Sequence, residues 1–355
     1  MKKTIACWFA LAIFLLSATS AAFADAEQPR LLLKSFLPLP DNKLVVYGKV
    51  MYLDPEDLQE NLENEHLELF FNHRAKDLPL TITVASMSIQ TQTNKVGDFI
   101  GIVPAATVLK LQGETSVSFT SSKFPAFHET ARFNLPTHPL YLIVSDIDDS
   151  VLESSEGKML KAIANSLFRP VHRREAVKGT PEIYRSLIRG TQGVDSLLVF
   201  LSGSPVYLAP RLEIFFSDKA FPDHALILQN VGPKENIWDR WFNKDVKRNL
   251  TTATMEYKLL QLAKLFKWYP ELQVILLGDS LADDPEIYQK MAEEFPGKVR
   301  LVVIRNITKQ PFDAPRYAGL KKAARLIVWN DPILLRQALA NENIVEPQGK
   351  KGMTP

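Results

Sequence analysis

Apolar segments that alternate with helical segments set the strongest limit on how this chain can fold. From Pro139 onward, continuous apolar runs such as LYLIVS (140–145), SLLVFL (196–201) and LQVILL (272–277) are separated by segments of helical character, among them TPEIYRSLIRG (180–190). A continuous apolar run indicates a strand buried on both faces, and the helices between runs provide the crossovers that parallel strands require. The pattern predicts an α/β fold, a parallel sheet flanked by helices.

The chain before Pro136 has the texture of antiparallel strands. Short segments rich in β-branched and aromatic residues are separated by turn signals, and in one of them Leu80, Ile82 and Val84 alternate with threonines. Five to seven such strands predict a small β-sandwich. The acidic segment DPEDLQENLENEH (54–66) interrupts them as a helix or a loop. The segments are KLVVYGKVMYL (43–53), LELFF (67–71), LTITVASMSIQTQT (80–93), DFIGIV (98–103) and SVSFTSS (116–122).

The N-terminus has the layout of a bacterial secretory signal. Lys2 and Lys3 precede an apolar run over residues 5–16, and the small-residue sequence AFA (22–24) follows. We therefore expect cleavage after residue 24 and export to the periplasm or beyond. A retained membrane anchor is the alternative, although the run is shorter than the roughly 20 residues of a membrane span. The single cysteine, Cys7, lies in this segment, so a cleaved chain has neither disulfides nor thiolate metal ligands.

These patterns divide the chain into four parts. We expect a signal peptide over 1–24, a β-sandwich domain over 25–137, a catalytic α/β domain over 138–342 and a disordered tail over 343–355. The chain contains 42 basic and 40 acidic residues. This balance argues against a nucleic-acid partner.

Polar side chains follow three of the apolar runs at the points where the strands end. Asp146, Asp148 and Asp149 follow the first run, Ser202 follows the second and Asp279 follows the third. Ligands of open α/β sheets bind at the carboxyl ends of the strands, so we expect these groups to meet at one edge. Asp149 is interpreted as a residue of the following turn.

The residue types suit phosphoryl transfer. Oxygen ligands are those that Mg²⁺ prefers, and Asp146 and Asp279 are the candidate ligands. Asp146 is the predicted nucleophile, and Asp148, two positions on, is the predicted general acid and base. Ser202 supplies a hydrogen bond for a phosphoryl oxygen, and Lys258, near the start of a predicted long helix, supplies a positive charge. Taken one at a time, each of these residues could be an ordinary turn or surface residue. The hypothesis of phosphoryl transfer rests on their order and their shared position at the strand ends.

With these residues in place, the sequence resembles the haloacid dehalogenase (HAD) superfamily of phosphohydrolases. That resemblance implies a HAD-like Rossmannoid sheet. Dehalogenase chemistry is disfavoured because that branch lacks the second aspartate, which is present here as Asp148. The superfamily motifs correspond to Asp146, Asp148 and Ser150 (D-x-D-x-T/S), Ser202, Lys258, and Asp279 with Asp283 or Asp284 (G-D followed by a second aspartate).

More narrowly, residues 140–306 resemble the catalytic domain of the actin-patch type phosphatidate phosphatases. The segments SDIDDSV, SGSPVYL and LGDSLADDPEIY match that family's S-D-I-D-D-T, S-x-S-P-x-x-L and L-G-D-S-x-x-x-D-P-E-I-Y. The connection FRPVHRREAVKGTPEIY and the strand VVYGKV of a smaller β domain are also similar. Two departures are Ser150 in place of the usual threonine, and Leu281-Ala282 in place of a small and acidic pair.

The resemblance implies a role for each residue. Asp146 attacks phosphorus and forms an aspartyl-phosphate, and Asp148 protonates the leaving oxygen and then activates water. The backbone carbonyl of Asp148 joins Asp146 and Asp279 around Mg²⁺. Asp284 aligns best with the family's final aspartate and supports the metal's water shell or the lysine, with Asp283 as the alternative.

The resemblance also implies a substrate, which the residues alone do not identify. Phosphatidate or another phospholipid is the expected phosphomonoester, with phosphatidate converted to diacylglycerol and with possible peripheral membrane contact. The alternatives are a broad-specificity exported phosphatase for soluble phosphomonoesters and a non-catalytic binding protein on the same scaffold. The basic residues Arg169 and 172–174 suit either a phosphate headgroup or a solvated turn. The oligomeric state has no signal in the sequence.

Overall fold

The computed structural model describes residues 28–39, 41–53, 74–111, 114–134, 136, 139–148, 150–151, 175–191, 195–205, 208–229 and 254–347. Several expectations lie outside these residues: the signal segment, the acidic insertion with the strand LELFF, Asp149, and the basic residues between 169 and 174. We refer to residues 28–134 as the β region and to residues 139–347 as the α/β region.

The α/β region contains the predicted parallel sheet. Six strands lie in the order β10-β9-β8-β11-β12-β13, and every neighbouring pair is parallel. β8 and β11 occupy the centre, which explains why their residues are apolar on both faces. The strands are β8 (Tyr141–Ser145), β9 (Leu197–Pro205), β10 (Ala225–Gln229), β11 (Gln273–Asp279), β12 (Val299–Arg305) and β13 (Leu326–Trp329).

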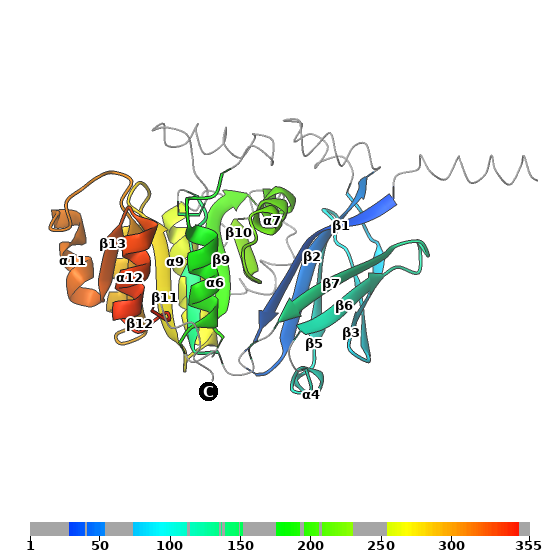
Figure 1. Cartoon of the computed structure of the whole chain (residues 1–355). Coiled ribbons are helices and arrows are strands. Elements are labelled where there is room, and N and C mark those ends of the chain that lie inside the picture. The colour runs from blue at the N-terminus through cyan, green and yellow to red at the C-terminus, as the bar shows by residue number, and fades with distance from the viewer. Residues whose placement is uncertain are drawn as a thin grey trace, which may run out of the picture.

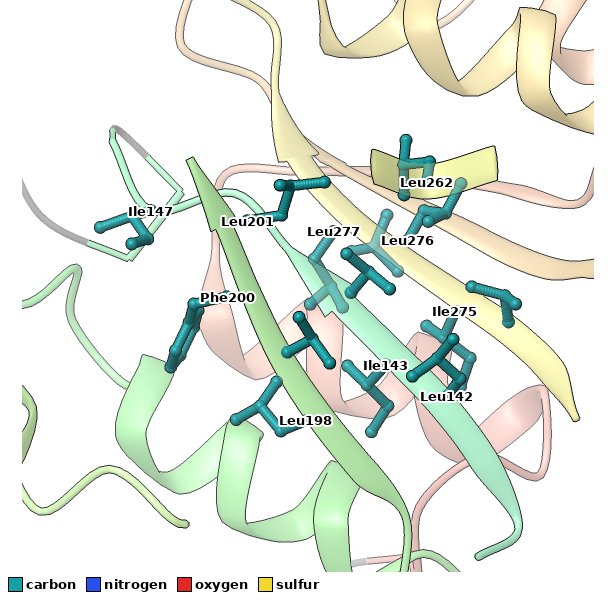
Figure 2. Close-up of a cluster of buried hydrophobic side chains, with 14 of the residues drawn as sticks. Leu142, Ile143, Ile147, Leu198, Phe200, Leu201, Leu262, Ile275, Leu276 and Leu277 are labelled. Carbon is teal, nitrogen blue, oxygen red and sulfur yellow. The ribbon is translucent and has the colours of Figure 1, made fainter. Parts of the chain in front are cut away.

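Helices cover both faces of this sheet, as the alternating pattern predicts. Figure 1 shows α6 and α12 side by side on the near face and α9 on the far face. Figure 2 shows apolar side chains of β8, β9 and β11 together with Leu262 of α9 in one buried cluster. No helix among the described residues is long and apolar enough to cross a membrane. The helices are α6 (Thr180–Arg189), α7 (Ala209–Asp218), α9 (Thr254–Trp268), α10 (Asp284–Glu294), α11 (Pro315–Ala323) and α12 (Pro332–Asn341).

The β region consists of two antiparallel sheets that share a second hydrophobic cluster. The sheet β1-β2-β5 and the sheet β4-β3-β6-β7 both contribute to it, with Val46, Ile82 and Phe119 fully buried. The alternating side chains of β3 and β5 account for this packing, because every second residue is buried. The elements are β1 (Gln28–Pro38), β2 (Leu44–Leu53), β3 (Pro79–Val84), β4 (Met87–Gln92), β5 (Asp98–Val103), α4 (Ala105–Val108), β6 (Glu114–Thr120) and β7 (His128–Asn134).

Strand β2 joins the two hydrophobic clusters, because its two faces point into different cores. Leu44 and Val46 belong to the cluster of the β region, whereas Val45 and Tyr47 belong to the cluster of the α/β region. The Tyr47 hydroxyl donates to the Leu226 carbonyl of β10. The two regions therefore pack through a buried interface.

The C-terminal end of the described chain is packed. Ile344 and Val345 are 0% and 1% exposed and belong to the hydrophobic cluster of the α/β region. Packed residues thus continue beyond residue 342, where the sequence predicts the α/β domain to end. The cause is the pair of β-branched side chains in the otherwise polar segment NENIVEPQ.

Candidate active site

Three neighbouring strands bring the predicted residues together at the carboxyl edge of the sheet. Asp146 directly follows β8, Ser202 lies near the end of β9 and Asp279 ends β11. β8 lies between the other two strands, and the Asp146 amide donates to the Leu277 carbonyl of β11 at 2.9 Å. Asp146 therefore lies at the centre of the group.

Lys258 enters this group from α9. Its Nζ lies 2.7 Å from Asp146 Oδ1 and 2.7 Å from Asp284 Oδ1. The lysine is 5% exposed, and a buried ammonium requires such partners. Burial alone would lower the pKa of Lys258, but the carboxylates of Asp146 and Asp284 outweigh it and raise the pKa above its ordinary value. Lys258 is therefore a fixed cation.

The structure places Asp284 in the site and Asp283 outside it. Asp284, the first residue of α10, is 0% exposed, and its Oδ2 accepts a hydrogen bond from the Asp279 amide at 3.1 Å. Asp283 is exposed one position earlier. Asp279 Oδ1 accepts from the amides of Leu281 at 2.5 Å and Ala282 at 3.0 Å. Backbone amides supply these bonds, so the unusual side chains at 281 and 282 leave them intact.

Gly278 is what allows Asp284 to lie against the end of β11. A Cβ at position 278 would lie 2.4 Å from Asp284 Oδ2 and 2.7 Å from Asp284 Cβ. Non-bonded carbon and oxygen atoms do not approach so closely. The glycine of the G-D motif is thus required by packing in the site.

Two hydroxyl groups hold Asp148. Ser202 Oγ donates to Asp148 Oδ2 at 3.1 Å, and Ser204 Oγ donates to the same oxygen at 2.9 Å. Ser202 Oγ also accepts from the Ser204 amide at 2.9 Å. These two bonds fix the orientation of the Asp148 carboxylate. The Asp148 carbonyl accepts a hydrogen bond from the Ser150 amide at 2.7 Å.

The site has an excess of negative charge. Among the described residues, four aspartates face one lysine. Burial, followed by the charge of Asp284, raises the pKa of Asp279 to about 7. Burial also raises the pKa of Asp146, with Asp284, Asp148 and Asp279 adding to the effect and Lys258 opposing it. Carboxylate oxygens of Asp146, Asp279 and Asp284 all lie within 4.8 Å of one another. A set of oxygen ligands with excess negative charge fits a divalent cation.

Some supporting residues were not identified from the sequence. Ser204, which supplies the second hydroxyl on Asp148, was given no role from the sequence, although the S-x-S spacing places both serines on one side of β9. Ser145 Oγ lies 2.6 Å from the Asp146 carbonyl and 2.5 Å from the Tyr184 hydroxyl. The Tyr288 hydroxyl donates to the Leu277 carbonyl at 2.7 Å. Tyr184 and Tyr288 end the family-like segments FRPVHRREAVKGTPEIY and LGDSLADDPEIY, but the sequence alone assigned them no role, because α6 and α10 bring them to the site from distant positions.

Comparisons with known proteins point to one family for this region. Residues 141–306 match the family model described as phosphatidate phosphatase APP1, catalytic domain. Residues 141–306, slightly less than half of the chain, are therefore similar to this catalytic-domain family. The resemblance stated from the motifs is thereby confirmed for these residues.

Curated relatives extend the similarity at low identity. Phosphatidate phosphatase APP1 of Saccharomyces cerevisiae is 21% identical over 271 residues, which are 73% of this chain and 43% of that protein. An uncharacterized protein of Schizosaccharomyces pombe is 26% identical over 167 residues, which are 46% of this chain and 25% of that protein. This chain therefore spans less than half the length of either relative.

A comparison with solved structures gives only weak similarity. A carbohydrate acetylesterase from Xanthomonas citri is 9% identical, with a TM-score of 0.29 over 83% of this chain and 68% of that protein. A score this low carries no argument about the fold or the activity.

Proposed function

We propose that this protein is a Mg²⁺-dependent phosphomonoester hydrolase that acts through an aspartyl-phosphate, with phosphatidate as its substrate. One observation carries the proposal: Lys258, Asp146 and Asp284 form a buried ionic cluster at the carboxyl edge of the sheet, within residues that match a phosphatidate phosphatase catalytic domain. A structural salt bridge does not require the further carboxylates of Asp148 and Asp279 beside it, whereas a phosphotransfer site does.

The chemistry follows from the positions of the residues. An Asp146 oxygen attacks phosphorus and the bond to the leaving oxygen breaks, while Asp148 gives that oxygen a proton. Asp148 then takes a proton from a water molecule, whose oxygen attacks phosphorus and releases inorganic phosphate from Asp146. Ser202 and Ser204 hold Asp148 in place through both steps. Lys258 stabilises the negative charge that builds up on the phosphoryl oxygens.

Mg²⁺ would be held by the carboxylates of Asp146 and Asp279 and by the Asp148 carbonyl, with Asp284 in support. When bound, the ion neutralises the carboxylates and the substrate phosphate. The raised pKa values of Asp146 and Asp279 support this assignment. Burial is their main cause and the neighbouring carboxylates add to it, so a bound cation would favour the ionised forms.

The proposal also covers the rest of the fold and the location of the protein outside the bacterial cytoplasm. The strand order and the acidic residues after β8 and β11 support a HAD-like arrangement of the α/β region. The two antiparallel sheets around one cluster support the β-sandwich. The basic and apolar N-terminal segment supports export from a bacterial cell.

Exposed apolar side chains support peripheral contact with a lipid surface. Phe312, Ile333 and Leu334 are 53%, 64% and 59% exposed. They lie after the ends of β12 and β13, at the edge of the sheet that carries Asp146. Lys321 lies 4.7 Å from the centre of the Phe312 ring and adds positive charge there. Apolar side chains beside basic ones suit an anionic membrane surface.

The test is hydrolysis by the purified protein. Phosphatidate in mixed micelles and p-nitrophenyl phosphate should be compared with Mg²⁺ and with excess chelator. We expect Mg²⁺-dependent release of phosphate with preference for phosphatidate, and a loss of roughly three orders of magnitude or more in Asp146→Asn. Asp283→Asn is the matched control and should retain activity, because Asp283 lies outside the cluster.

Each alternative has its own result. A preference for p-nitrophenyl phosphate would identify a general phosphatase. Undiminished turnover by Asp146→Asn would exclude the proposed nucleophile, and inactivity of the wild type on a broad panel with Mg²⁺ would favour a binding protein.

A further inference from the structure

A cavity of about 520 Å³ lies between the β region and the α/β region. β1 and β7 line one side, and α6, α7 and the starts of β9 and β10 line the other. Figure 1 shows α7 and β10 next to β1. The starts of β9 and β10 are their amino ends, so this amino-edge cavity lies at the opposite edge of the sheet from the candidate active site. What it binds is therefore independent of the proposed function.

Three polar atoms of the wall lack a hydrogen-bond partner within the described part of the chain. They are Ser196 Oγ, Glu213 Oε1 and His224 Nε2, each buried at the atomic level. Ser196 is 3% exposed, the His224 side chain is 8% exposed and the Glu213 side chain is 21% exposed. An unpaired buried polar group costs about 1–3 kcal/mol. The cavity size falls within the range of small-molecule sites, roughly 300–1,000 Å³.

Glu213 and His224 form a pair with a defined gap. His224 Nδ1 lies 2.9 Å from the Pro222 carbonyl, which only accepts, so Nδ1 carries the hydrogen and Nε2 presents a lone pair. Nε2 and Glu213 Oε1 are 3.8 Å apart, too far for a direct hydrogen bond. Both atoms have almost no accessible surface, so a ligand hydroxyl reaches them only after one of the two side chains rotates. Placed about 2.8 Å from both atoms, that hydroxyl would bridge them.

Burial favours the uncharged forms of both residues near neutral pH. Burial raises the pKa of Glu213 to about 8, with Lys34 opposing the effect. Burial lowers the pKa of His224 to about 4, with the Pro222 carbonyl opposing it. At pH 7 the wall therefore offers a carboxyl donor next to an imidazole acceptor, an arrangement that a hydroxyl group matches.

The rest of the lining points to a neutral ligand. Lys34 and Arg132 are balanced by Asp195 and Asp223, so the rim does not select for an anion. The remaining wall includes the partly exposed rings of Phe36 and Phe221, which suit the C–H face of a sugar ring.

We propose that the amino-edge cavity binds a neutral, hydroxyl-rich small molecule, a saccharide or polyol, with one hydroxyl held between Glu213 and His224. Ser196 takes a second hydroxyl of the same molecule. Because β1 and β7 form one wall, this ligand contacts both regions of the chain.

The test is calorimetric titration of the whole protein in buffer free of glycerol and sugars. The neutral probes are glucose, maltose, myo-inositol and glycerol, and the anionic probes are inorganic phosphate and glycerol 3-phosphate. We expect saturable binding of a neutral probe. Its Kd should rise at least about tenfold in His224→Phe and in Ser196→Ala, each of which removes one hydrogen-bond partner. Glu213→Gln, which keeps a donor and an acceptor, should change Kd by less than about threefold. His128→Phe, at an exposed position on β7, is the matched control and should leave Kd unchanged.

A second measurement does not depend on the variants folding. The ¹⁵N shift of His224 Nε2 in the wild type should move when the neutral probe binds. The proposal is overturned if only the anionic probes bind, if binding survives both His224→Phe and Ser196→Ala, or if no probe binds and the shift shows a bond to water alone. These readouts need no phosphatase activity, so their failure and that of the proposed function are distinguishable.

Discussion

Replacing Gly278 with alanine tests whether the geometry of the G-D motif is required by packing. The added Cβ would meet Asp284 Oδ2 at 2.4 Å and Asp284 Cβ at 2.7 Å. Neither atom can retreat easily, because Asp284 is fully buried and bonded to Lys258 and to the Asp279 amide. We therefore expect the Asp284 side chain to be displaced and at least one of these bonds to be lost.

The size of the effect follows from two contributions. Overpacking in a rigid environment costs about 1–3 kcal/mol, and a buried amide left without its acceptor costs a similar amount. Since the two overlap, we expect the free energy of unfolding to fall by about 2–4 kcal/mol. A displacement of about 1 Å in such a site lowers kcat roughly 100-fold. Urea unfolding followed by tryptophan fluorescence and Mg²⁺-dependent phosphate release measure the two effects.

Gly319→Ala is the matched control. Its Cβ would also approach another residue, at 2.3 Å, but that neighbour is the end of the Gln289 side chain, which can move aside. Gly319 lies in α11, where exchange of glycine for alanine stabilises by up to about 1 kcal/mol. We expect equal or slightly higher stability and full activity. Wild-type stability and activity in Gly278→Ala, or equal losses in both variants, would refute the reasoning.

Two further predictions concern Glu213 in the amino-edge cavity and the exposed apolar residues at the start of α12. Burial raises the pKa of Glu213 from 4.5 to about 8, so its contribution to stability is present below pH 4.5 and is lost as the pH rises towards 8. His224 opposes this only below pH 6.5. Between pH 6.5 and 8 the free energy of unfolding should therefore fall by about 2 kcal/mol more in the wild type than in Glu213→Gln, and equal slopes in urea titrations would contradict the assignment. Exchange of Ile333 and Leu334 for serine should weaken binding to anionic phospholipid vesicles severalfold without affecting hydrolysis of p-nitrophenyl phosphate. The control Leu109→Ser, in the loop after α4, should leave both activities unchanged. If the double variant sediments with vesicles as the wild type does, this edge of the sheet is not the membrane-contacting surface.

The parallel sheet was predictable because its signal is local. A strand covered on both faces must be apolar at every position, and β8 and β11 carry this requirement in their own sequences. β1 (Gln28–Pro38) was not recognised, because its alternation is broken by a register shift between Leu31 and Leu33. Its apolar residues also serve two cores: Leu33 packs in the α/β region and Leu31 packs against the cluster of the β region.

Other elements were missed for related reasons. β7 is half exposed and polar at every second position, so its segment HETARFN resembles a loop. α11 contains a glycine and two adjacent lysines, and only Tyr317 and Leu320 are buried in it. Segments with so few buried residues carry little apolar periodicity, and tertiary contacts decide their structure.

Residues of the candidate site could be predicted from the sequence pattern chiefly where they follow the end of an apolar strand. Asp146, Ser202 and Asp279 follow apolar runs, and the topology of a parallel sheet then brings them together. No such rule says which of Asp283 and Asp284 lies in the site. That depends on the turn that starts α10, which directs one carboxylate onto Lys258 and its neighbour into solvent.

The amino-edge cavity shows the limit of local signals most clearly. Ser196, Glu213 and His224 give no signal in the sequence and lie in different parts of the chain. They meet only in the folded protein, where α7 and the starts of β9 and β10 line one cavity. Polar residues that follow an apolar strand indicate a site at the carboxyl edge of a parallel sheet, whereas polar residues that precede a strand look like ordinary turn residues. A site at the amino edge therefore becomes visible only when the burial and pairing of its atoms are known, and unpaired buried atoms such as His224 Nε2 are the feature by which to find it.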